Sequence, residues 1–264
     1  MVHRRLRDIS VWQFESFQKF GNILHFVSDR HDGTSTGKCS GLNLSLKVDD
    51  TPEHVLRNRK LLADNLNLDP GAFLFPDQCH TSNIRRVDAG ISDSALLNTD
   101  ALMTNISGRV LCVTTADCIP LIILDRLAHT IAVIHAGWRG LADGIIPGTI
   151  GRLKSEYNCQ PENLFVGMGP SISAKHYEVG SDVLEKIEQV TGNLNQITFS
   201  SPSKGKAFLD LGNMAKFQLL SEGISETNIE ISGICTFDNT SDFYSARKEG
   251  FNTGRFCTGI MIKE

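Results

Sequence analysis

Several short runs of this sequence are apolar at consecutive positions instead of alternate ones, and this limits how the chain can fold. The runs PLIIL (120–124) and IAVI (131–134) are far too short to cross a membrane. They also have no polar face to turn toward water, so strands at these places must be covered on both sides. We expect strands within LNLSLKV (42–48), GRVLCVTTAD (108–117), PLIILD (120–125), TIAVIHAG (130–137), NLFVGMG (163–169), NIEISGICTF (228–237) and FCTGIMI (256–262).

Helical segments are interspersed with these strands. The segments 51–68, 141–157, 181–192 and 211–223 have apolar residues at helical spacing. Thr51 is expected to cap the first of them, with Pro52 at its first turn. In the third, Ile187 and Val190 are expected to face inward, with Gly192 as the stop. Because helices and strands do not alternate regularly, we expect an α/β sandwich of mixed β-sheets with helices on the outside.

Composition excludes several classes of function. The net charge of −4 provides no broad basic field, so nucleic acid is not an expected partner. No apolar run is long enough for a membrane span, and no apolar segment follows the basic start MVHRRLRDIS, so neither a membrane partner nor a signal peptide is expected. Seven cysteines without a CxxC pair favour reduced thiols in the cytoplasm.

The length of 264 residues suits one large domain or two small ones. No repeat and no linker rich in Pro or Ser divides the chain, so a single domain over residues 1–264 is the simpler interpretation. The sequence does not fix an oligomeric state.

The segment TTADCIPLIILDRLAHTIAVIHAGWRG predicts a β-hairpin with chemistry at its open end. A turn centred between Arg126 and Leu127 places Cys118 directly opposite His135. Opposed residues in an antiparallel pair have Cβ atoms about 5 Å apart on one face of the sheet. A thiol and an imidazole are therefore expected side by side, next to loops.

Such a pair has two chemical uses. His135 can activate a Cys118 thiolate as a nucleophile. Alternatively, both side chains can bind a metal, and a catalytic zinc site then needs a third protein ligand and an open position. His80, in the loop-like FPDQCHTSNIR, is the candidate for that third ligand. A buried cysteine beside a hydrogen-bonded histidine remains the plain structural alternative.

Together the motifs resemble the laccase-domain family, once called polyphenol oxidases. Members of this family are similar to purine nucleoside phosphorylases that also deaminate adenosine. The resemblance starts at about residue 43 and runs to the C-terminus. Its motifs are QCH (78–80), DALMT (100–104), TADCIP (115–120), HAGWRG (135–140), GPSISAKHYEVG (169–180), LDL (209–211) and TGR (253–255).

The resemblance implies one laccase-type domain with four layers and a metal site made by His80, Cys118 and His135. It implies zinc, with copper as the alternative metal, and a purine nucleoside and phosphate as small-molecule substrates. Adenosine, inosine or methylthioadenosine would be split into base and ribose 1-phosphate. Cys79 stands where the family usually has an aliphatic residue, and is a possible competing ligand.

Six further residues are candidate substrate contacts. Arg139, between two glycines after a strand, is the first candidate for binding phosphate, because guanidinium matches phosphate in a bidentate manner. Arg59 and Arg247 are the second choices. Tyr177 offers a ring for stacking on a purine. Asn43 and Ser45 alternate on the strand expected at 42–48 and could both bind the nucleoside.

Three rival functions stay open at this point. The first is a copper polyphenol oxidase, although the eight histidines include no HxH pair of the kind a trinuclear copper cluster needs. The second is a cysteine hydrolase or amidase acting on a cell-wall precursor, with Cys118 as nucleophile and His135 as base. The third is a binding protein without catalysis, which no motif favours. Deamination also lacks the usual proton shuttle, since no H-x-E motif follows His80 or His135.

Overall fold

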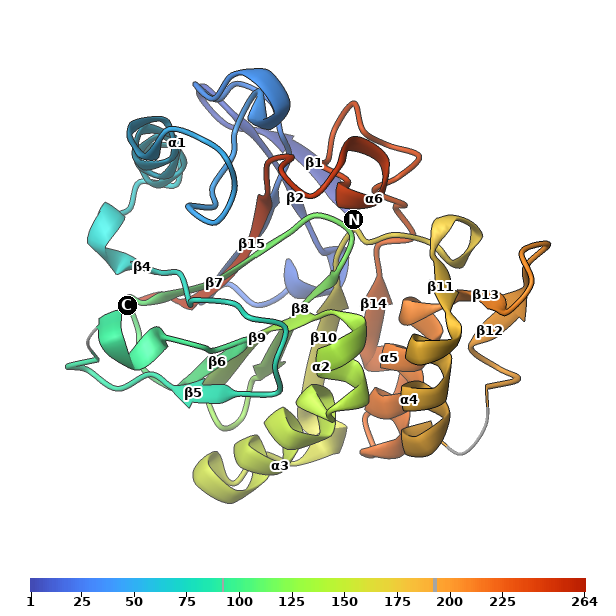
Figure 1. Cartoon of the computed structure of the whole chain (residues 1–264). Coiled ribbons are helices and arrows are strands. Elements are labelled where there is room, and N and C mark those ends of the chain that lie inside the picture. The colour runs from blue at the N-terminus through green and yellow to red at the C-terminus, as the bar shows by residue number, and fades with distance from the viewer. Residues whose placement is uncertain (92, 192–193) are drawn as a thin grey trace.

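The structure, a computed structural model, describes residues 1–91, 93–191 and 194–264 and has two large β-sheets (Figure 1). The first sheet has the order β1-β2-β3-β15-β7-β4 and the second β14-β10-β8-β9-β6-β5. The first is made by β1 (Val2–Arg5), β2 (Ser10–Gln13), β3 (Ile23–Ser28), β15 (Phe256–Ile262), β7 (Val110–Thr115) and β4 (Phe73–Leu74). The second is made by β14 (Ile229–Ile231), β10 (Leu164–Met168), β8 (Ile119–Asp125), β9 (Thr130–Ala136), β6 (Ala101–Thr104) and β5 (Ile84–Arg86).

Both sheets are mixed. In the first, β4 runs parallel to β7 while the other pairs are antiparallel; in the second, β14 and β5 run parallel to their neighbours. A third, small sheet has the order β11-β13-β12. It contains β11 (Glu178–Gly180), β13 (Lys206–Leu209) and β12 (Thr198–Ser200).

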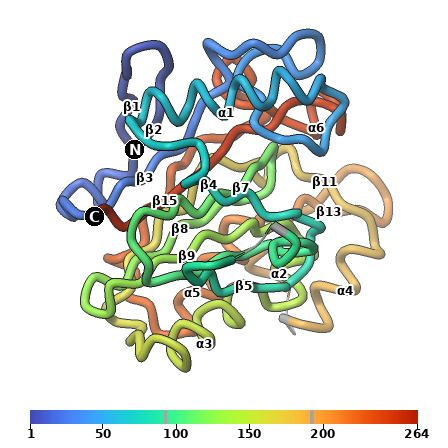
Figure 2. The backbone as a smooth tube through the Cα atoms, turned by 90° about the vertical axis from the view of Figure 1, so that its left-hand side faces the viewer, coloured from blue at the N-terminus to red at the C-terminus, as the bar shows by residue number. Residues whose placement is uncertain are grey.

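The helices lie outside the two large sheets, so the molecule has the expected sandwich of layers (Figure 2). They are α1 (Pro52–Asn65), α2 (Trp138–Ala142), α3 (Ile145–Tyr157), α4 (Ser181–Thr191), α5 (Leu211–Ser221) and α6 (Ala246–Glu249). The α1 helix covers the outer face of the first sheet, and α2, α3 and α5 cover the outer face of the second (Figures 1 and 2). No helix among the described residues is long and apolar enough to cross a membrane.

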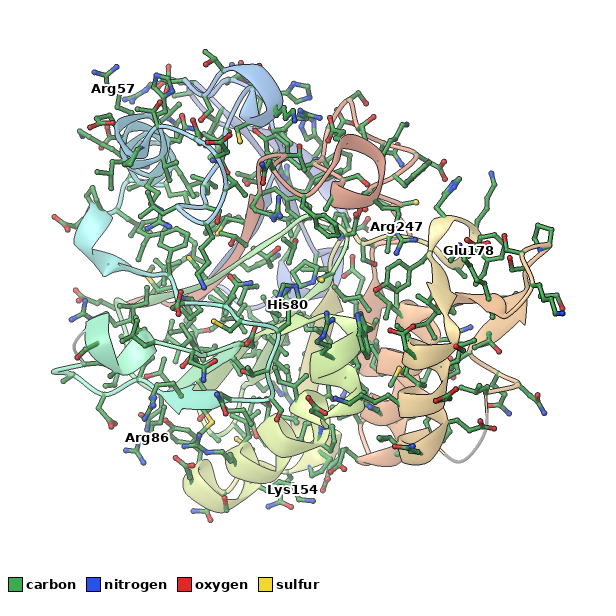
Figure 3. All side chains as sticks on the ribbon, viewed as in Figure 1. Arg57, His80, Arg86, Lys154, Glu178 and Arg247 are labelled. Carbon is green, nitrogen blue, oxygen red and sulfur yellow. The ribbon has the colours of Figure 1, made fainter. Side chains whose placement is uncertain are left out.

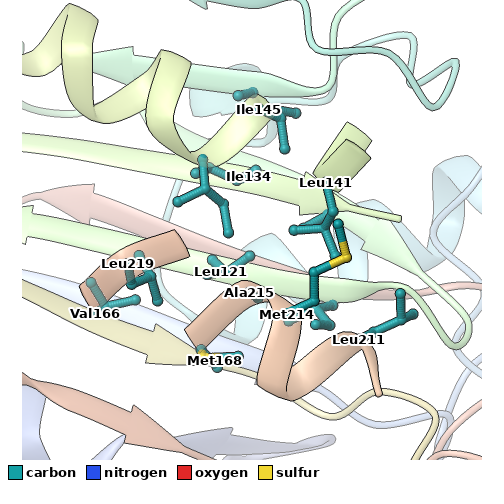
Figure 4. Close-up of a cluster of buried hydrophobic side chains, with 14 of the residues drawn as sticks. Leu121, Ile134, Leu141, Ile145, Val166, Met168, Leu211, Met214, Ala215 and Leu219 are labelled. Carbon is teal, nitrogen blue, oxygen red and sulfur yellow. The ribbon is translucent and has the colours of Figure 1, made fainter. Parts of the chain in front are cut away.

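The consecutive apolar residues of the strands fill separate cores on their two faces. In β8, Leu121 packs toward the helices while Ile122 packs between the two sheets. In β7, Leu111 likewise points between the sheets and Cys112 points toward α1. Figure 4 shows the helix side of the second sheet, where Leu121 lies under the helices. This two-sided burial explains why these strands lack an alternating polar face.

Some expected elements have different boundaries. The segment 42–48 forms no strand, since Asn43 and Ser45 lie in a loop fixed by side-chain bonds. The helix expected over 141–157 breaks before α3 at Gly144, whose φ of 77° is left-handed. In α4, Ile187 is buried as expected, but Val190 is exposed, so its inward placement was wrong. Gly192, the expected stop of that helix, lies outside the described residues.

The expected hairpin forms, with a register shifted by two residues. Strands β8 and β9 are antiparallel, but His135 is opposite Pro120 and not opposite Cys118. The turn is longer than expected because Asp125 pairs with Thr130 and its carboxylate accepts the amides of Leu127 and Ala128. A shift of two residues preserves the alternation of faces, so the thiol stays near the imidazole.

Candidate active site

Three segments that are far apart in the sequence bring His80, Cys118 and His135 together. His80 comes from the loop between β4 and β5, Cys118 directly precedes β8, and His135 lies near the end of β9. One ligand atom from each lies within 4.8 Å of the other two, and the two imidazole centroids are 4.7 Å apart. Two imidazoles and one thiol at this separation are a suitable set for a transition metal.

Asp100 orients the buried His135. Its carboxylate Oδ1 lies 2.7 Å from His135 Nδ1, and its carbonyl accepts the amide of His135 at 2.8 Å. Asp100 directly precedes β6, which pairs with β9, so the two strands hold the pair in register. When Nδ1 of the neutral ring donates to this carboxylate, Nε2 carries the lone pair that a metal would use.

The same carboxylate fixes the loop of His80. Its oxygens accept the amides of Cys79, His80 and Thr81 at 3.1, 3.1 and 2.8 Å, and the Thr81 hydroxyl at 2.8 Å. This nest bends the backbone so that His80 takes a φ of 59°, a left-handed conformation that histidine adopts at some cost. Asp100 therefore positions two members of the cluster at once.

Gly137 leaves space for the side chains of Cys118 and His80. A Cβ at this position would lie 3.0 Å from Cys118 Sγ and 3.1 Å from His80 Cδ2. The φ of Gly137 is −81°, so any residue could adopt its backbone conformation. The glycine in HAGWRG is therefore required for space and not for backbone freedom.

The electrostatics of the cluster favour a thiolate. Burial opposes ionisation of Cys118, but His135 and His80 lower the pKa of this thiol to about 6. Burial alone would lower the pKa of His135, yet Cys118 and Asp100 raise it to about 9. Burial would likewise raise the pKa of Asp100, whereas its bond to His135 lowers it to about 2. The thiolate is the form that both binds a metal and acts as a nucleophile.

Three of the expected substrate contacts lie near Cys118. Arg247 covers the ring of Tyr177 at 4.8 Å and donates to the carbonyl of Glu178 at 2.7 Å. Burial raises the pKa of Tyr177, and the charges of Cys118, Arg247 and Arg139 all act on its hydroxyl. Figure 3 shows His80 near the centre of the view, with Arg247 and Glu178 together beside β11. Arg139 is exposed on the short helix α2 and lies over Trp138.

The other three come from the segment 43–59, before and within α1. Ser45 and Arg59 line a cavity of about 570 Å³ that reaches Gln78. The guanidinium of Arg59 stacks on Phe75 at 3.7 Å and donates to the carbonyl of Leu44.

Asn43 is buried, and protein groups use its whole amide. Nδ2 donates to Asp50 and to the carbonyl of Ser45, while Oδ1 accepts the amides of Ser45 and Arg255. A nucleoside would therefore have to displace these bonds. The strand face on which Asn43 and Ser45 were expected to alternate does not exist, because this segment is a loop.

Several residues matter more than the sequence suggested. Asp100 and Arg255 both lie in motifs of the family resemblance, DALMT and TGR, but neither was given a role. Arg255 is half-buried and its charge reaches Cys118. Cys79, the possible competing ligand, is exposed; its Sγ lies 3.5 Å from Lys47 Nζ, and it is not a member of the cluster.

Asp117, beside Cys118, is engaged as a hydrogen-bond acceptor. Its oxygens accept the hydroxyl of Thr236 at 2.6 Å and the amide of Arg247 at 2.7 Å. Both oxygens are thus occupied by protein donors. This ties the segment around Cys118 to the C-terminal part of the chain.

Comparison with known proteins shows the family. Residues 24–263 match the family described as multi-copper polyphenol oxidoreductase laccase. The chain belongs to this family. The match begins before residue 43, so it also includes most of β3 in the first sheet, where no motif had been recognised.

Relatives and solved structures agree with this assignment. A purine nucleoside phosphorylase of Bacteroides thetaiotaomicron is 34% identical over 97% of both chains. Adenosine deaminase RL5, from an unknown prokaryotic organism, is 36% identical over 85% of this chain and 88% of its own. The hypothetical protein YfiH of Bacillus licheniformis has a TM-score of 0.91 at 28% identity, with 99% of both chains covered. The chain thus belongs to a family of enzymes whose laccase-type description implies metal binding.

Proposed function

We propose that this protein is a zinc-dependent purine nucleoside phosphorylase with adenosine deaminase activity. The observation that carries the proposal is the cluster of His80, Cys118 and His135, held by Asp100, in a chain whose relatives are named for these two activities. Adenosine, inosine and methylthioadenosine are the substrates we propose, with phosphate as the second reactant.

The donor set suits zinc. His80, Cys118 and His135 would hold the ion, as in catalytic sites that have three protein ligands and one open position. Asp100 acts on His135 as the carboxylate partners of zinc-bound histidines do, by fixing the ring and raising its basicity. A bound zinc ion supplies Lewis acidity that makes water a nucleophile near neutral pH, which is what deamination of adenosine requires.

Phosphorolysis needs an anion held beside the ribose. Arg139 is exposed, Arg247 lies over Tyr177, and both charges act on the Tyr177 hydroxyl, as the charge of Cys118 does. We assign phosphate to this side of the cluster, because one guanidinium group can donate two parallel N–H bonds to two phosphate oxygens. Tyr177 offers its ring to the purine. Ser45 and Arg59, which line the cavity, would bind the other end of the nucleoside. Asn43 would hold the loop of Ser45 in place by accepting the amide of Arg255.

Chromatography of adenosine incubated with the zinc-loaded protein, with and without phosphate, tests the proposal. Adenine that appears only with phosphate establishes phosphorolysis, and inosine without phosphate establishes deamination. Cys118→Ala is expected to lose both products. Cys159→Ala, a buried cysteine on the helix side of the second sheet, is the matched control and should retain them. Unchanged adenosine in both conditions would refute the proposal.

A second candidate function follows from the order Cys118, His135, Asp100. This is the arrangement of a thiol nucleophile, its base and the carboxylate that orients the base. A cysteine hydrolase or amidase, for instance on a cell-wall precursor, would need no metal. Alkylation by iodoacetamide separates the two functions: zinc should protect Cys118 in the phosphorylase, and activity should survive chelation only in the hydrolase.

Copper at the same ligands is the remaining alternative for the metal. Each group of metal-binding side chains among the described residues contains no more than two histidines. A trinuclear copper cluster needs several histidines close together, so we do not propose laccase chemistry as the main activity.

A further inference from the structure

A second group of metal-ligand types lies outside the proposed active site. His176, Cys235 and Asp238 each place one ligand atom within 4.8 Å of the other two. His176 ends the short turn Ala174–His176 before β11, and the other two residues come from the segment after β14. An imidazole nitrogen, a thiol and a carboxylate oxygen are the three donor types that proteins use for zinc.

The backbone holds these donors in place. Residues 235–238 form a turn in which the carbonyl of Cys235 accepts both the amide and the side chain of Asn239, at 3.0 and 2.8 Å. The turn therefore directs Cys235 and Asp238 to one side. The ring of His176 stacks on Phe237 with centroids 4.1 Å apart, which fixes its orientation. His176 Nε2 and Asp238 Oδ1 already lie 2.7 Å apart.

The sulfur also has a donor typical of a metal-bound thiolate. The amide of Ser173 donates to Cys235 Sγ at 3.4 Å. Hydrogen bonds of this kind orient the ligand atoms of a metal site. Asp238 is about half exposed, while His176 is mostly covered, so an ion can enter from solvent and still be held from behind.

We propose that His176, Cys235 and Asp238 form a second site for a thiophilic divalent cation of the zinc type, with one position open to solvent. Among the described residues, the other histidine–aspartate pairs on the surface do not have this donor set. His31 and Asp242 lie 2.9 Å apart, but they belong to no such group of three among the described residues. The thiol therefore distinguishes the site from an ordinary surface ion pair.

The position of the second site suggests a structural role for its ion. Thr236, next to Cys235, donates to Asp117 at 2.6 Å, and Asp117 precedes Cys118. The backbone of Ser171 also pairs with Cys235, and the neighbouring Ile172 donates its amide to the carbonyl of Asp117. An ion bound by His176, Cys235 and Asp238 would therefore stiffen the segment that carries Cys118.

Binding of Co²⁺ and Zn²⁺ to the metal-free full chain tests the second site separately from the first. Wild type is expected to bind two equivalents. Cys118→Ala should still bind one, with thiolate-to-cobalt charge-transfer absorption that comes from Cys235. Cys235→Ser and Asp238→Asn in the Cys118→Ala background should each weaken this remaining binding by about 100-fold or more.

His31→Asn in the same background is the matched control and should leave the remaining equivalent unchanged. A single equivalent in wild type, with none left in Cys118→Ala, would overturn the second site without affecting the proposed function. So would binding without charge-transfer absorption in Cys118→Ala. Circular dichroism of each variant separates loss of the site from loss of the fold.

Discussion

At the scale of a single residue, Asp100 provides the sharpest test of the proposed metal site. Its carboxylate accepts from His135 Nδ1 and from the backbone around His80, so it orients two of the three proposed ligands. Asp100→Asn keeps the size but replaces one acceptor oxygen by a donor and removes the charge. We expect zinc affinity, measured by chelator competition, to fall by about 10–100-fold. Asp88→Asn, an exposed carboxylate paired with Arg86, is the control, and an equal loss there would contradict the assignment.

Gly137 tests whether space limits the cluster. Gly137→Ala puts a methyl group 3.0 Å from Cys118 Sγ, so the thiol or His80 has to move. We expect zinc affinity and activity to fall while the protein stays folded, because the backbone conformation is open to alanine. Gly151→Ala in α3 has nothing within 4 Å of the new methyl and should raise stability by up to about 1 kcal/mol. Full activity of Gly137→Ala, measured with adenosine, would show that the cluster accommodates the methyl group and that space does not limit it.

At the scale of elements, His25 in β3 makes the sheet sensitive to acid. Burial lowers its pKa to about 4, and its ring Nε2 lies 3.0 Å from the amide of Phe14. The unfolded chain binds this proton below about pH 6.5, whereas the folded protein resists it down to about pH 4. The contribution of neutral His25 to the free energy of unfolding is therefore fully present above about pH 6.5 and falls by roughly 2–3 kcal/mol as the pH drops toward 4.

Urea unfolding between pH 7 and about pH 4.5 measures this effect. His25→Gln keeps a polar side chain that can pair with the Phe14 backbone but removes the titration. The variant is expected to lose most of this slope. If its free energy of unfolding falls as steeply as that of wild type, another group is responsible.

The hairpin of β8 and β9 shows what a sequence can reveal about elements. Their apolar runs predicted two strands buried on both faces, and the cores on each side confirm this. Register was wrong by two residues because the carboxylate of Asp125 closes a longer turn, and an apolar pattern contains no information about turn length. Cys118 and His135 remained close because an even shift preserves the faces.

Other parts of the site depended on contacts between distant segments. The alternation in 42–48 looked like a strand, but Asn43 is held by Asp50 and by the backbone of Arg255, far away in the chain. The role of Asp100 follows from the pairing of β6 with β9, which brings its carboxylate to His135. His80, Cys118 and His135 were found because motif residues mark them, whereas their supporting carboxylate is defined by sheet order, which the sequence did not provide.

At the scale of the whole molecule, the proposed ligands come from parts of the fold that are far apart in the sequence. His80 follows β4 of the first sheet, Cys118 lies on the connection from the first sheet to the second, and His135 belongs to the second sheet. An ion bound by all three would link the two sheets where β7 leads into β8. Since the unfolded chain cannot hold these ligands together, metal binding adds to the free energy of folding.

Calorimetry of the metal-free and zinc-loaded protein measures this coupling. Free zinc at 100 times its dissociation constant should add about 2.7 kcal/mol. In a chain of this size such a gain raises the midpoint of thermal unfolding by about 5–10 °C. In Cys118→Ala, zinc should no longer produce the part of the shift that belongs to this cluster, and any remainder belongs to other ligands. An equal shift in wild type and Cys118→Ala would mean that zinc binds elsewhere, and that this cluster does not link the two sheets through a metal ion.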